Sequence, residues 1–302
     1  MGQNQSSAMS AYVPVKFDWK EYQYIKTLGA GGFGEVYLVT DVKTHVKFAL
    51  KKIKCGSNDD LENVMQELKS MSKLKHHNIM AMYETRCKQK DDFWAEIYMI
   101  FEYCCGGTLN DRLDKPSSKA LDVKWMQQLS EAVAYIHALE LVHRDLKPDN
   151  VLMDANDNVK IGDFGLSCDF VAAKRKDQSW EKYYMTTQCG TLFYMAPEVF
   201  NGHYTEKADV FALGVLMYII VERSCAEING MKFYGIFIRV DEFDRAPLGM
   251  QMYSDNAGLK VPFSKSSPKM AQIVGSALFF DQKKRASAST INGKLQDYAK
   301  EL

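Results

Sequence analysis

The sequence predicts an α+β protein built from two units, the first a small antiparallel β-sheet with one main helix and the second larger and mainly helical. Its 302 residues are about twice the roughly 150 residues of a typical domain. Apolar residues make up 46% of the chain, which is enough to bury a substantial core. Strand patterns fill most of the first hundred residues, whereas helical spacing of apolar residues dominates the rest.

The folded body is expected to begin at Tyr22, because residues 1–21 are rich in Gln, Asn and Ser and lack apolar periodicity. Three segments rich in β-branched or aromatic residues follow, separated by a glycine cluster and a polar turn. We expect them to be strands of one antiparallel sheet, and they are Tyr24–Leu28, Val36–Thr40 and Lys47–Ile53.

Helices are predicted before and after one further strand. Asp59 or Asp60 can cap a first helix, whose apolar face consists of Leu61, Val64, Met65, Leu68, Met71 and Leu74. Ile97–Tyr103 returns to a strand pattern. Asp122 can cap a second long helix, one face of which carries Met126, Leu129, Val133 and Ile136. Residues 241–267 carry turn signals and little periodicity, so no element is predicted there.

Charge and cysteine usage exclude several classes of protein. Thirty-eight basic residues balance thirty-eight acidic ones, so we expect no nucleic-acid partner. The seven cysteines show no zinc-ligand spacing and are odd in number, which predicts free thiols in a reducing, intracellular compartment. The longest apolar run, Phe211–Val221, is about half of the ~20 residues that span a membrane, and no secretory signal opens the chain. We expect a soluble body.

A glycine-rich segment joins the first two expected strands, and it reads Gly29-Ala30-Gly31-Gly32-Phe33-Gly34. Backbone amides without crowding side chains can close over phosphates. A dinucleotide-binding fold would need a helix directly after the glycines, and here a strand follows. A Walker loop would need Gly-Lys-Ser/Thr, and here Glu35 follows Gly34. Both of those alternatives are excluded, while an ordinary glycine-rich hairpin stays open for the segment by itself.

Lys51 lies on the third expected strand, where its ammonium could bind the phosphates of a nucleotide while the small Ala49 leaves room for the adenine ring. Glu67, on the first predicted helix, could pair with Lys51 and hold it towards the phosphates. A solvated strand lysine and an exposed helical glutamate are the alternatives for these residues when each is taken alone.

A more specific pattern follows in His143-Arg144-Asp145-Leu146-Lys147-Pro148-Asp149-Asn150. Asp145 can accept the proton of a substrate hydroxyl, and Lys147 can neutralise a transferring phosphoryl group. Asn150 and Asp163, the latter in Asp163-Phe164-Gly165, are oxygen ligands of the kind that magnesium prefers. The order of these motifs, closed by Ala196-Pro197-Glu198, makes a chance arrangement improbable.

From about Tyr22 to about Tyr298 the chain resembles the eukaryotic protein kinase family. The resemblance implies a bilobed protein-kinase fold over residues 22–298, with an N-lobe at about 22–103 and a C-lobe at about 104–298, and it implies ATP and Mg²⁺ as cofactors and proteins as substrates. It also implies a hinge for adenine at Glu102, Tyr103 and Cys104. The other nucleotide contacts implied are Leu28, Gly29, Ala30, Gly31, Gly32, Phe33, Gly34, Val36, Ala49, Lys51, Phe101 and Leu152.

Three structural roles follow from the same resemblance. Asp209 should support the catalytic-loop backbone, and Glu198 should pair with Arg285. Four residues should stack in the active state, and they are Met71, Met82, His143 and Phe164. The stretch from Arg223 to Gln282 matches no pattern of the family that can be placed.

Lys147 and Gly190-Thr191 are similar to the serine/threonine class, and the segment around Ala196-Pro197-Glu198 is similar to the PDZ-LIM-protein-interacting kinase group, whose members are linked to nucleus and actin. Leu166, directly after the Asp-Phe-Gly motif, implies serine over threonine as acceptor. The activating phosphate is expected at Thr187, four residues before Thr191, where it would pair with Arg144.

Two other classes are weighed against an active protein kinase. A pseudokinase scaffold would usually have lost Lys51, Asp145 or Asn150, and all three are present. A small-molecule kinase is disfavoured, because the Ala-Pro-Glu segment and its threonine loop serve to hold a polypeptide.

Met1 to Ser6 fit the M-G-x-x-x-[ST] pattern, so Gly2 is a candidate for myristoylation, which would give reversible membrane attachment at most. We expect a cytoplasmic protein, with the nucleus as a second candidate location, and the sequence indicates no oligomeric state.

Overall fold

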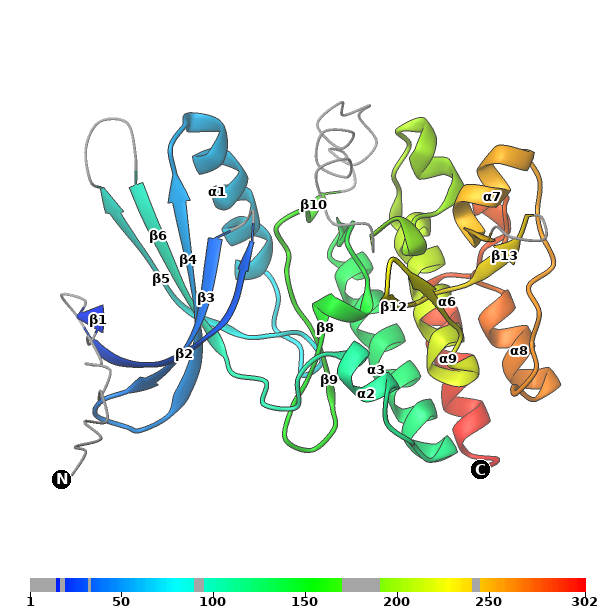
Figure 1. Cartoon of the computed structure of the whole chain (residues 1–302), viewed down its shortest axis with the longest axis horizontal. Coiled ribbons are helices and arrows are strands. Elements are labelled where there is room, and N and C mark those ends of the chain that lie inside the picture. The colour runs from blue at the N-terminus through cyan, green and yellow to red at the C-terminus, as the bar shows by residue number, and fades with distance from the viewer. Residues whose placement is uncertain (1–14, 17–19, 32–33, 90–94, 170–190, 241–244) are drawn as a thin grey trace, which may run out of the picture. The chain divides into compact units, whose positions relative to one another are not determined.

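The computed structural model describes residues 15–16, 20–31, 34–89, 95–169, 191–240 and 245–302. The chain forms two compact units, drawn in Figure 1. The first unit combines residues 1–62 with 81–103, and the second combines residues 63–80 with 104–302. The boundary after Tyr103 coincides with the predicted lobe boundary, whereas residues 63–80 belong with the second unit.

Hydrogen bonds explain why residues 63–80 group with the second unit. The Asn78 side-chain Nδ2 donates to the Val159 carbonyl at 2.8 Å. The Met80 backbone N–H donates to the Ile161 carbonyl at 2.9 Å. Both acceptors lie on a strand of the second unit, so the stretch that follows the first helix is bonded to that unit by its own backbone and side chains.

The first unit is built on an antiparallel sheet in the order β1-β2-β3-β4-β6-β5 (Figure 1). Its strands are β1 (Val15–Lys16), β2 (Glu21–Gly31), β3 (Gly34–Asp41), β4 (Lys47–Cys55), β5 (Met82–Gln89) and β6 (Ala95–Glu102). The four predicted strands are confirmed. Three of them are longer than predicted, whereas β6 begins two residues earlier and ends one residue earlier than predicted. Strand β5 was not predicted, because its residues MYETRCKQ are mostly polar or charged and do not alternate clearly.

One face of this sheet carries a small core. Tyr22, Val39, Leu50 and Ile100 are almost fully buried and pack together, with Tyr37, Phe48 and Tyr98 against them. Successive side chains of a strand point to opposite faces, so Ala49 and Lys51 lie on the other face of β4 from Leu50. Burial of aromatic and aliphatic side chains on one face therefore fixes which side chains of β3 and β4 face the opposite way.

The first helix, α1 (Asn58–Ser72), has a different cap from the predicted one. The Ser57 hydroxyl accepts a hydrogen bond from the Asp60 backbone N–H at 3.2 Å, so Ser57 is the capping residue and the prediction of Asp59 or Asp60 was wrong. The apolar face is also narrower than predicted. Val64 and Met71 are buried, whereas Leu61 and Met65 are 36% and 55% exposed.

The second unit is mainly helical (Figure 1). Its α-helices are α2 (Leu109–Leu113), α3 (Lys119–Ala138), α6 (Glu206–Glu222), α7 (Leu248–Asp255), α8 (Pro268–Gly275) and α9 (Ala288–Ala299). Short strands accompany them, namely β7 (Leu141–Val142), β8 (Val151–Met153), β9 (Val159–Ile161), β10 (Cys168–Asp169), β11 (Cys225–Ile228), β12 (Met231–Tyr234), β13 (Phe237–Arg239) and β14 (Arg245–Pro247). Four single 3₁₀ turns complete the described elements, at Pro148–Asn150, Thr191–Tyr194, Pro197–Asn201 and Gln282–Lys284.

Helix α3 keeps its predicted apolar face but begins earlier than predicted. Ser118 is its N-cap, because the Ser118 hydroxyl accepts from the Leu121 backbone N–H at 3.2 Å. The prediction that Asp122 caps this helix was therefore wrong. The predicted face is confirmed, since Met126, Leu129, Val133 and Ile136 are all at most 1% exposed.

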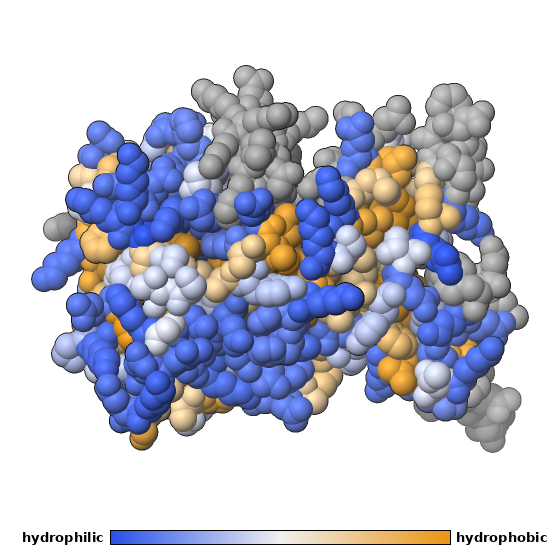
Figure 2. Space-filling view, turned by 180° about the vertical axis from the view of Figure 1, so that it is seen from behind, coloured by the Kyte–Doolittle hydropathy of each residue, from blue (hydrophilic) through white to orange (hydrophobic). Residues whose placement is uncertain are grey.

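Helix α6 contains the predicted apolar run Phe211–Val221 and is buried over almost its whole length. Within the described part of the chain, no helix combines the length and the apolar character needed to cross a bilayer. Figure 2 shows one face of the molecule on which hydrophilic residues predominate and hydrophobic residues form smaller patches. The strongly apolar sequence of α6 thus reflects burial inside the second unit.

The stretch for which no element was predicted contains α7 and part of a strand pair. The β11–β12 hairpin precedes it, and β13 pairs with β14. Pro247 occupies the capping position of helix α7, and no side chain caps its first turn. A Ser, Thr, Asp or Asn at that position would have indicated the helix start in the sequence. Five cysteines whose side chains the structure describes are free thiols, as predicted, and they are Cys55, Cys87, Cys104, Cys105 and Cys225.

Candidate active site

The predicted catalytic loop, residues 143–150 of the second unit, is supported by one buried carboxylate on α6. Asp209 accepts hydrogen bonds from the backbone N–H of His143 at 2.8 Å and of Arg144 at 3.0 Å. This confirms the predicted support of the loop backbone. Arg144 has a φ of 72°, a region that non-glycine residues occupy only at some cost, and the paired bonds to Asp209 hold it there.

Asp209 has two further partners that the sequence did not reveal. The His137 ring lies 3.0 Å from Oδ2, and the Tyr204 hydroxyl donates to Oδ1 at 2.8 Å. Burial by itself would raise the pKa of Asp209, but the bonds from His137 and from the His143 backbone outweigh it and hold the pKa below its usual value. The carboxylate therefore stays ionised although its side chain is completely buried.

One carboxylate oxygen of Asp145 accepts hydrogen bonds, and the other accepts none from the described residues. Its Oδ2 accepts from Lys147 Nζ at 2.8 Å and from Asn150 Nδ2 at 2.9 Å. Its Oδ1 is buried and has no hydrogen-bond partner among the described residues. A buried acceptor without a donor is costly, so this oxygen fits a position where a substrate hydroxyl donates.

Burial raises the pKa of Asp145 above its ordinary value, while the Lys147 ammonium acts in the opposite direction. The same ammonium donates to the Thr191 hydroxyl at 3.0 Å. Lys147 thus joins the catalytic loop to the segment that starts at Thr191. Thr191 is therefore linked to Asp145 through Lys147, and a regulatory role for Thr191 stays a prediction.

Asn150 and Asp163 offer oxygen atoms that suit magnesium. The Asn150 amide nitrogen donates to the carbonyl and the carboxylate of Asp145, which leaves its side-chain oxygen without a donor among the described residues. The Gly162 backbone N–H donates to the Asn150 carbonyl at 2.9 Å, so the residue before Asp163 is bonded to the catalytic loop. An amide oxygen and a carboxylate are hard ligands, so the residues present fit a magnesium ion.

The glycine after Phe164 lies beside two carboxylates. A Cβ atom at Gly165 would lie 3.4 Å from Asp163 Oδ1 and 3.6 Å from Glu67 Oε2. Glu67 is 4% exposed and lies in the second unit together with Asp163. The structure therefore brings Glu67 close to the Asp-Phe-Gly turn.

Part of the predicted stack is present within the second unit. The His143 and Phe164 rings meet edge to face with centroids 4.7 Å apart, and Met71 of the same unit is buried. The His143 ring also lies 3.0 Å from the Gly162 carbonyl. Met82 belongs to the first unit, so its membership of the stack stays a prediction.

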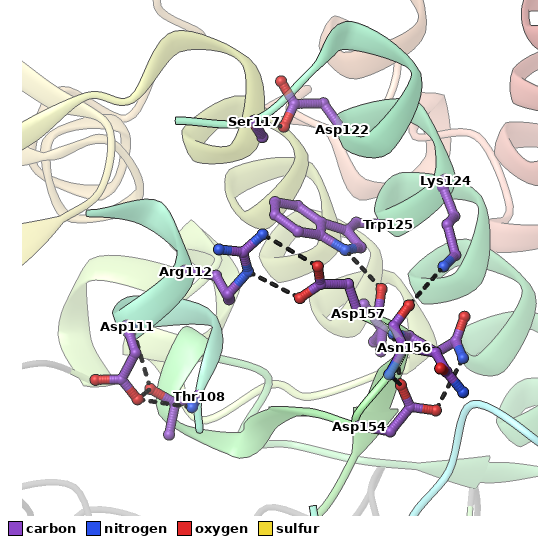
Figure 3. A network of polar contacts seen from close by, with 12 residues as sticks. Thr108, Asp111, Arg112, Ser117, Asp122, Lys124, Trp125, Asp154, Asn156 and Asp157 are labelled. Carbon is purple, nitrogen blue, oxygen red and sulfur yellow. Dashed lines mark hydrogen bonds and ion pairs between the residues drawn. The ribbon is translucent and has the colours of Figure 1, made fainter. Parts of the chain in front are cut away.

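The turn between β8 and β9 is held by α2 and α3, as Figure 3 shows. The Arg112 guanidinium forms an ion pair with the Asp157 carboxylate at 3.0 Å, and Trp125 Nε1 donates to the Asp157 carbonyl at 2.9 Å. Lys124 Nζ donates to the Asn156 carbonyl at 3.1 Å. Since β8 follows the catalytic loop and β9 leads to the Asp-Phe-Gly turn, this network positions both.

In the first unit, strand register places several predicted nucleotide contacts on one face. Val36 pairs with Lys51 and Leu38 with Ala49, and Ala49 pairs with Phe101 on the next strand. Alternation along each strand then puts these side chains on the same face of the sheet. Lys51 is 8% exposed, so it is not the solvated strand lysine that was the alternative reading of this position.

The glycine-rich segment contains one position that only glycine fits. Gly34 has a φ of 110°, and a Cβ atom there would lie 2.1 Å from the Lys52 carbonyl oxygen. Leu28, at a register shift between Thr27 and Gly29, is 40% exposed. In the β2–β3 hairpin, Gly29 pairs with Val36 and Gly31 pairs with Gly34. The hairpin geometry agrees with a backbone that approaches phosphates closely.

The other predicted site residues lie in the first unit, in the second unit or outside the described residues. Glu102 accepts from the Ala81 backbone N–H through Oε1 at 2.7 Å. Tyr103 ends the first unit and Cys104 begins the second, and Leu152 lies on β8 of the second unit. Gly32, Phe33, Thr187 and Gly2 lie outside the described residues.

The predicted ion pair after the Ala-Pro-Glu segment is confirmed. Arg285 is almost fully buried, and its Nη1 and Nη2 donate to the two carboxylate oxygens of Glu198 at 2.5 and 2.8 Å. The Arg285 side chain also donates to the Lys207 and Phe279 carbonyls. These bonds fix the end of the segment that begins at Thr191.

One histidine cluster has metal-ligand spacing among the described residues. Ligand atoms of His76, His77 and Glu131 all lie within 4.8 Å of one another. His76 Nδ1, however, accepts a hydrogen bond from the Asn78 backbone N–H at 3.1 Å, which places the ring proton on Nε2. Coordination through Nε2 would require the opposite tautomer, so the cluster is better explained as the end of a turn.

Comparison with known proteins gives a family match and several relatives. The family model described as "Protein kinase domain" matches residues 22–295. Calcium-dependent protein kinase 4 of Plasmodium falciparum (isolate 3D7) is 32% identical over 231 residues, which cover 74% of this chain and 41% of that protein. CBL-interacting serine/threonine-protein kinase 12 of Arabidopsis thaliana is 35% identical over 206 residues, with 66% and 40% covered. CBL-interacting protein kinase 11 of Oryza sativa subsp. japonica is 35% identical over 207 residues, with 66% and 39% covered.

The chain thus spans about two fifths of the length of the curated relatives that it matches. The family match takes in both units, from the first strands of the sheet to α9. His137 and Tyr204 were not predicted as supports of Asp209. His137 lies 72 residues from Asp209, so no local pattern relates the two. Tyr204 lies five residues before Asp209, but a single tyrosine at that spacing belongs to no recognised motif.

Proposed function

Because this chain belongs to the protein kinase family, we propose that it is an active serine/threonine protein kinase that transfers the γ-phosphoryl group of ATP to hydroxyl groups of proteins. The single observation that carries the proposal is the geometry of Asp145. One of its oxygens is held by Lys147 and Asn150, and the other is buried with no donor among the described residues. Such an oxygen is suited to accept a proton from an incoming hydroxyl.

In this mechanism Asp145 Oδ1 orients the acceptor hydroxyl and takes its proton as the new oxygen–phosphorus bond forms. The bond between the γ-phosphorus and the β–γ bridging oxygen breaks, and ADP leaves with the electron pair. Lys147, held between Asp145 and Thr191, offers its positive charge to the transferring phosphoryl group. Asn150 and Asp163 would hold magnesium, which neutralises phosphate charge when bound.

The first unit contributes the nucleotide contacts in this proposal. Lys51 binds phosphate oxygens, and Ala49 and Val36 on the same face leave space for adenine. The pairing of Glu67 with Lys51 stays a prediction from the sequence, because the two residues belong to different units. The acceptor is serine rather than threonine, a preference that rests on Leu166 and on resemblance.

The direct test is turnover by purified protein with radiolabelled ATP, magnesium and a mixed serine and threonine peptide pool. Asp145→Asn should lower kcat by at least about a thousandfold, because it removes the proton acceptor while the loop bonds to Asp209 remain. ATP affinity and Tm should stay within error of the wild type. Wild-type protein that binds ATP and transfers no phosphate to any peptide would favour the pseudokinase scaffold instead.

Regulation, location and lipid attachment belong to the same proposal. Phosphorylation of Thr187 would order the substrate segment through Arg144. The protein acts inside the cell, in the cytoplasm with the nucleus as a second location, and a myristoyl group on Gly2 gives reversible membrane attachment. The intact mass of protein expressed together with an N-myristoyltransferase decides the last point, since a species without added acyl mass would exclude it.

A further inference from the structure

A buried aromatic residue lies two positions after Thr191. Phe193 is 7% exposed, and its ring meets Phe233 of β12 and Phe237 of β13 edge to face, with centroids 5.2 and 5.3 Å away. Phe233 and Phe237 are themselves half-buried. The segment that lies against Lys147 on one side is therefore packed against an aromatic pair from residues 225–249, which sequence analysis could not place.

The next residue adds a directed bond to the same contact. The Tyr194 hydroxyl donates to the Tyr234 carbonyl at 2.5 Å. Tyr194 is 6% exposed, and burial raises its pKa well above the ordinary value, so the hydroxyl keeps its proton at physiological pH. A buried hydroxyl without this partner would bear the desolvation cost of an unsatisfied polar group.

The backbone of α7 makes a third contact with this segment. A Cβ atom at Gly249 would lie 1.9 Å from the Met195 carbonyl oxygen. The Leu248 backbone N–H donates to the Ile236 carbonyl at 2.9 Å, which ties α7 to the turn between the two strand pairs. Phe193 thus contacts β12 and β13, Tyr194 contacts β12, and Met195 contacts α7. We call the residues that make these contacts the bracket, and they are Phe233, Tyr234, Ile236, Phe237, Leu248 and Gly249.

The bracket has an anchor that is independent of the segment it contacts. Asp114, at the end of α2, accepts from the Tyr234 hydroxyl at 2.8 Å and from Lys232 Nζ at 2.5 Å. The Lys232 ammonium also lies 4.6 Å from the centre of the Tyr234 ring. Tyr234 is therefore hydrogen-bonded through its side chain to Asp114 and through its carbonyl to Tyr194.

We propose that the bracket is a positioning element for the acceptor polypeptide, with Phe233 and Tyr234 as its positioning residues. This rests on the proposed kinase function. The bracket holds residues 191–196 at a fixed distance from Asp145, because Thr191 is bonded through Lys147 to the catalytic carboxylate while Phe193 and Tyr194 are held by β12. Loosening the bracket lets the acceptor hydroxyl move away from Asp145 Oδ1 without changing the nucleotide contacts of the first unit.

The test compares Phe233→Ala with Met231→Ala, a control on the same strand whose side chain is 59% exposed. Phe233→Ala should lower kcat/KM for a peptide acceptor by about ten- to a hundredfold, as expected for a misplaced substrate. The KM for ATP should stay within about twofold of the wild type, and Phe233→Leu should recover part of the loss. Met231→Ala should match the wild type in every parameter.

A second measurement tests the bracket without turnover. Hydrogen exchange of the amides of residues 191–196 should be faster in Phe233→Ala than in wild type and unchanged in Met231→Ala. Equal exchange in all three proteins would overturn the proposal. So would a Phe233→Ala protein in which kcat/KM for peptide, the affinity for ATP and Tm all fall together. Wild-type protein that fails to phosphorylate peptides would overturn the proposed function alone, because the exchange result decides on the bracket in either case.

Discussion

At Asp145, burial and a neighbouring cation act in opposite directions on one carboxyl group. Burial raises the pKa above the ordinary 3.8, and Lys147 opposes the rise. A general base must be ionised, so peptide phosphorylation should be lost as pH falls through this raised pKa. Lys147→Ala should lower the rate and move the acid limb of the kcat/KM profile to higher pH, because it removes the opposing charge.

The control for this pH profile is Lys300→Ala, an exposed lysine paired with Asp297 in the last helical turn. It should leave both the rate and the acid limb where they are in the wild type. If Lys147→Ala lowered the rate and left the acid limb unmoved, the titrating group would not be Asp145, and the assignment of the base would have to change.

At the scale of single elements, Glu222 shows how one helix end depends on pH. It is the last residue of α6 and accepts from the backbone N–H groups of Ser264, Lys265 and Ser266 and from both serine hydroxyls. Burial would raise its pKa, but these bonds lower it from 4.5 to about 2. A depressed pKa means stability that is present above pH 4.5 and lost as pH falls towards 2, by about 3 kcal/mol.

Glu222→Gln should therefore be less stable than wild type at pH 6, and the difference should close as pH falls from about 5 to 2. The measurement is the free energy of unfolding from urea titrations at several pH values. Asp297→Asn serves as the control, because Asp297 is exposed and its loss should leave the pH dependence almost unchanged. A stability difference between Glu222→Gln and wild type that is the same at every pH would show that the carboxylate charge is not what holds this helix end.

Sequence patterns predicted elements well where a single stretch of chain determines them. The face of α3 and the strands β3 and β4 follow from local periodicity, and the spacing of Asp145, Asn150 and Asp163 follows from the chemistry of one loop and one turn. Helix starts were predicted poorly, because Ser57 and Ser118 compete with nearby aspartates for the same capping position.

The rest of the site could not be predicted from sequence, since it depends on pairs that are far apart along the chain. His137 reaches Asp209 across 72 residues, and Tyr194 reaches Tyr234 across 40. Neither pair leaves a periodic or spaced signal. Strand β5 and helix α7 were not predicted for a related reason, because packing against neighbouring elements stabilises them more than their own sequence does.

At the scale of the whole molecule, the proposed control of activity by Thr187 can be tested. A phosphate there would carry about −1.5 to −2 charges and would pair with Arg144, whose guanidinium lies 5.7 Å from the centre of the Tyr204 ring. Thr187→Ala should lower kcat/KM for peptide with little change in ATP affinity, and phosphatase should have the same effect on wild type.

The matched control is Thr186→Ala, which removes the neighbouring hydroxyl and should leave both activity and the phosphatase effect as in wild type. Phosphatase should have no further effect on Thr187→Ala. Equal activity of Thr187→Ala and wild type, before and after phosphatase, would show that the segment is ordered without phosphate on this residue.

The close approach at Gly249 also has a genetic consequence. Every other amino acid would place a Cβ atom 1.9 Å from the Met195 carbonyl oxygen, and a carbonyl held within the main chain cannot move aside cheaply. In a saturation screen that selects for function, position 249 should therefore tolerate glycine alone, as strictly as Asp145 tolerates aspartate. A map of mutational tolerance would place Gly249 among the essential residues although it carries no reactive group, and the two kinds of intolerance would separate only when the soluble yield of each variant is measured beside its activity.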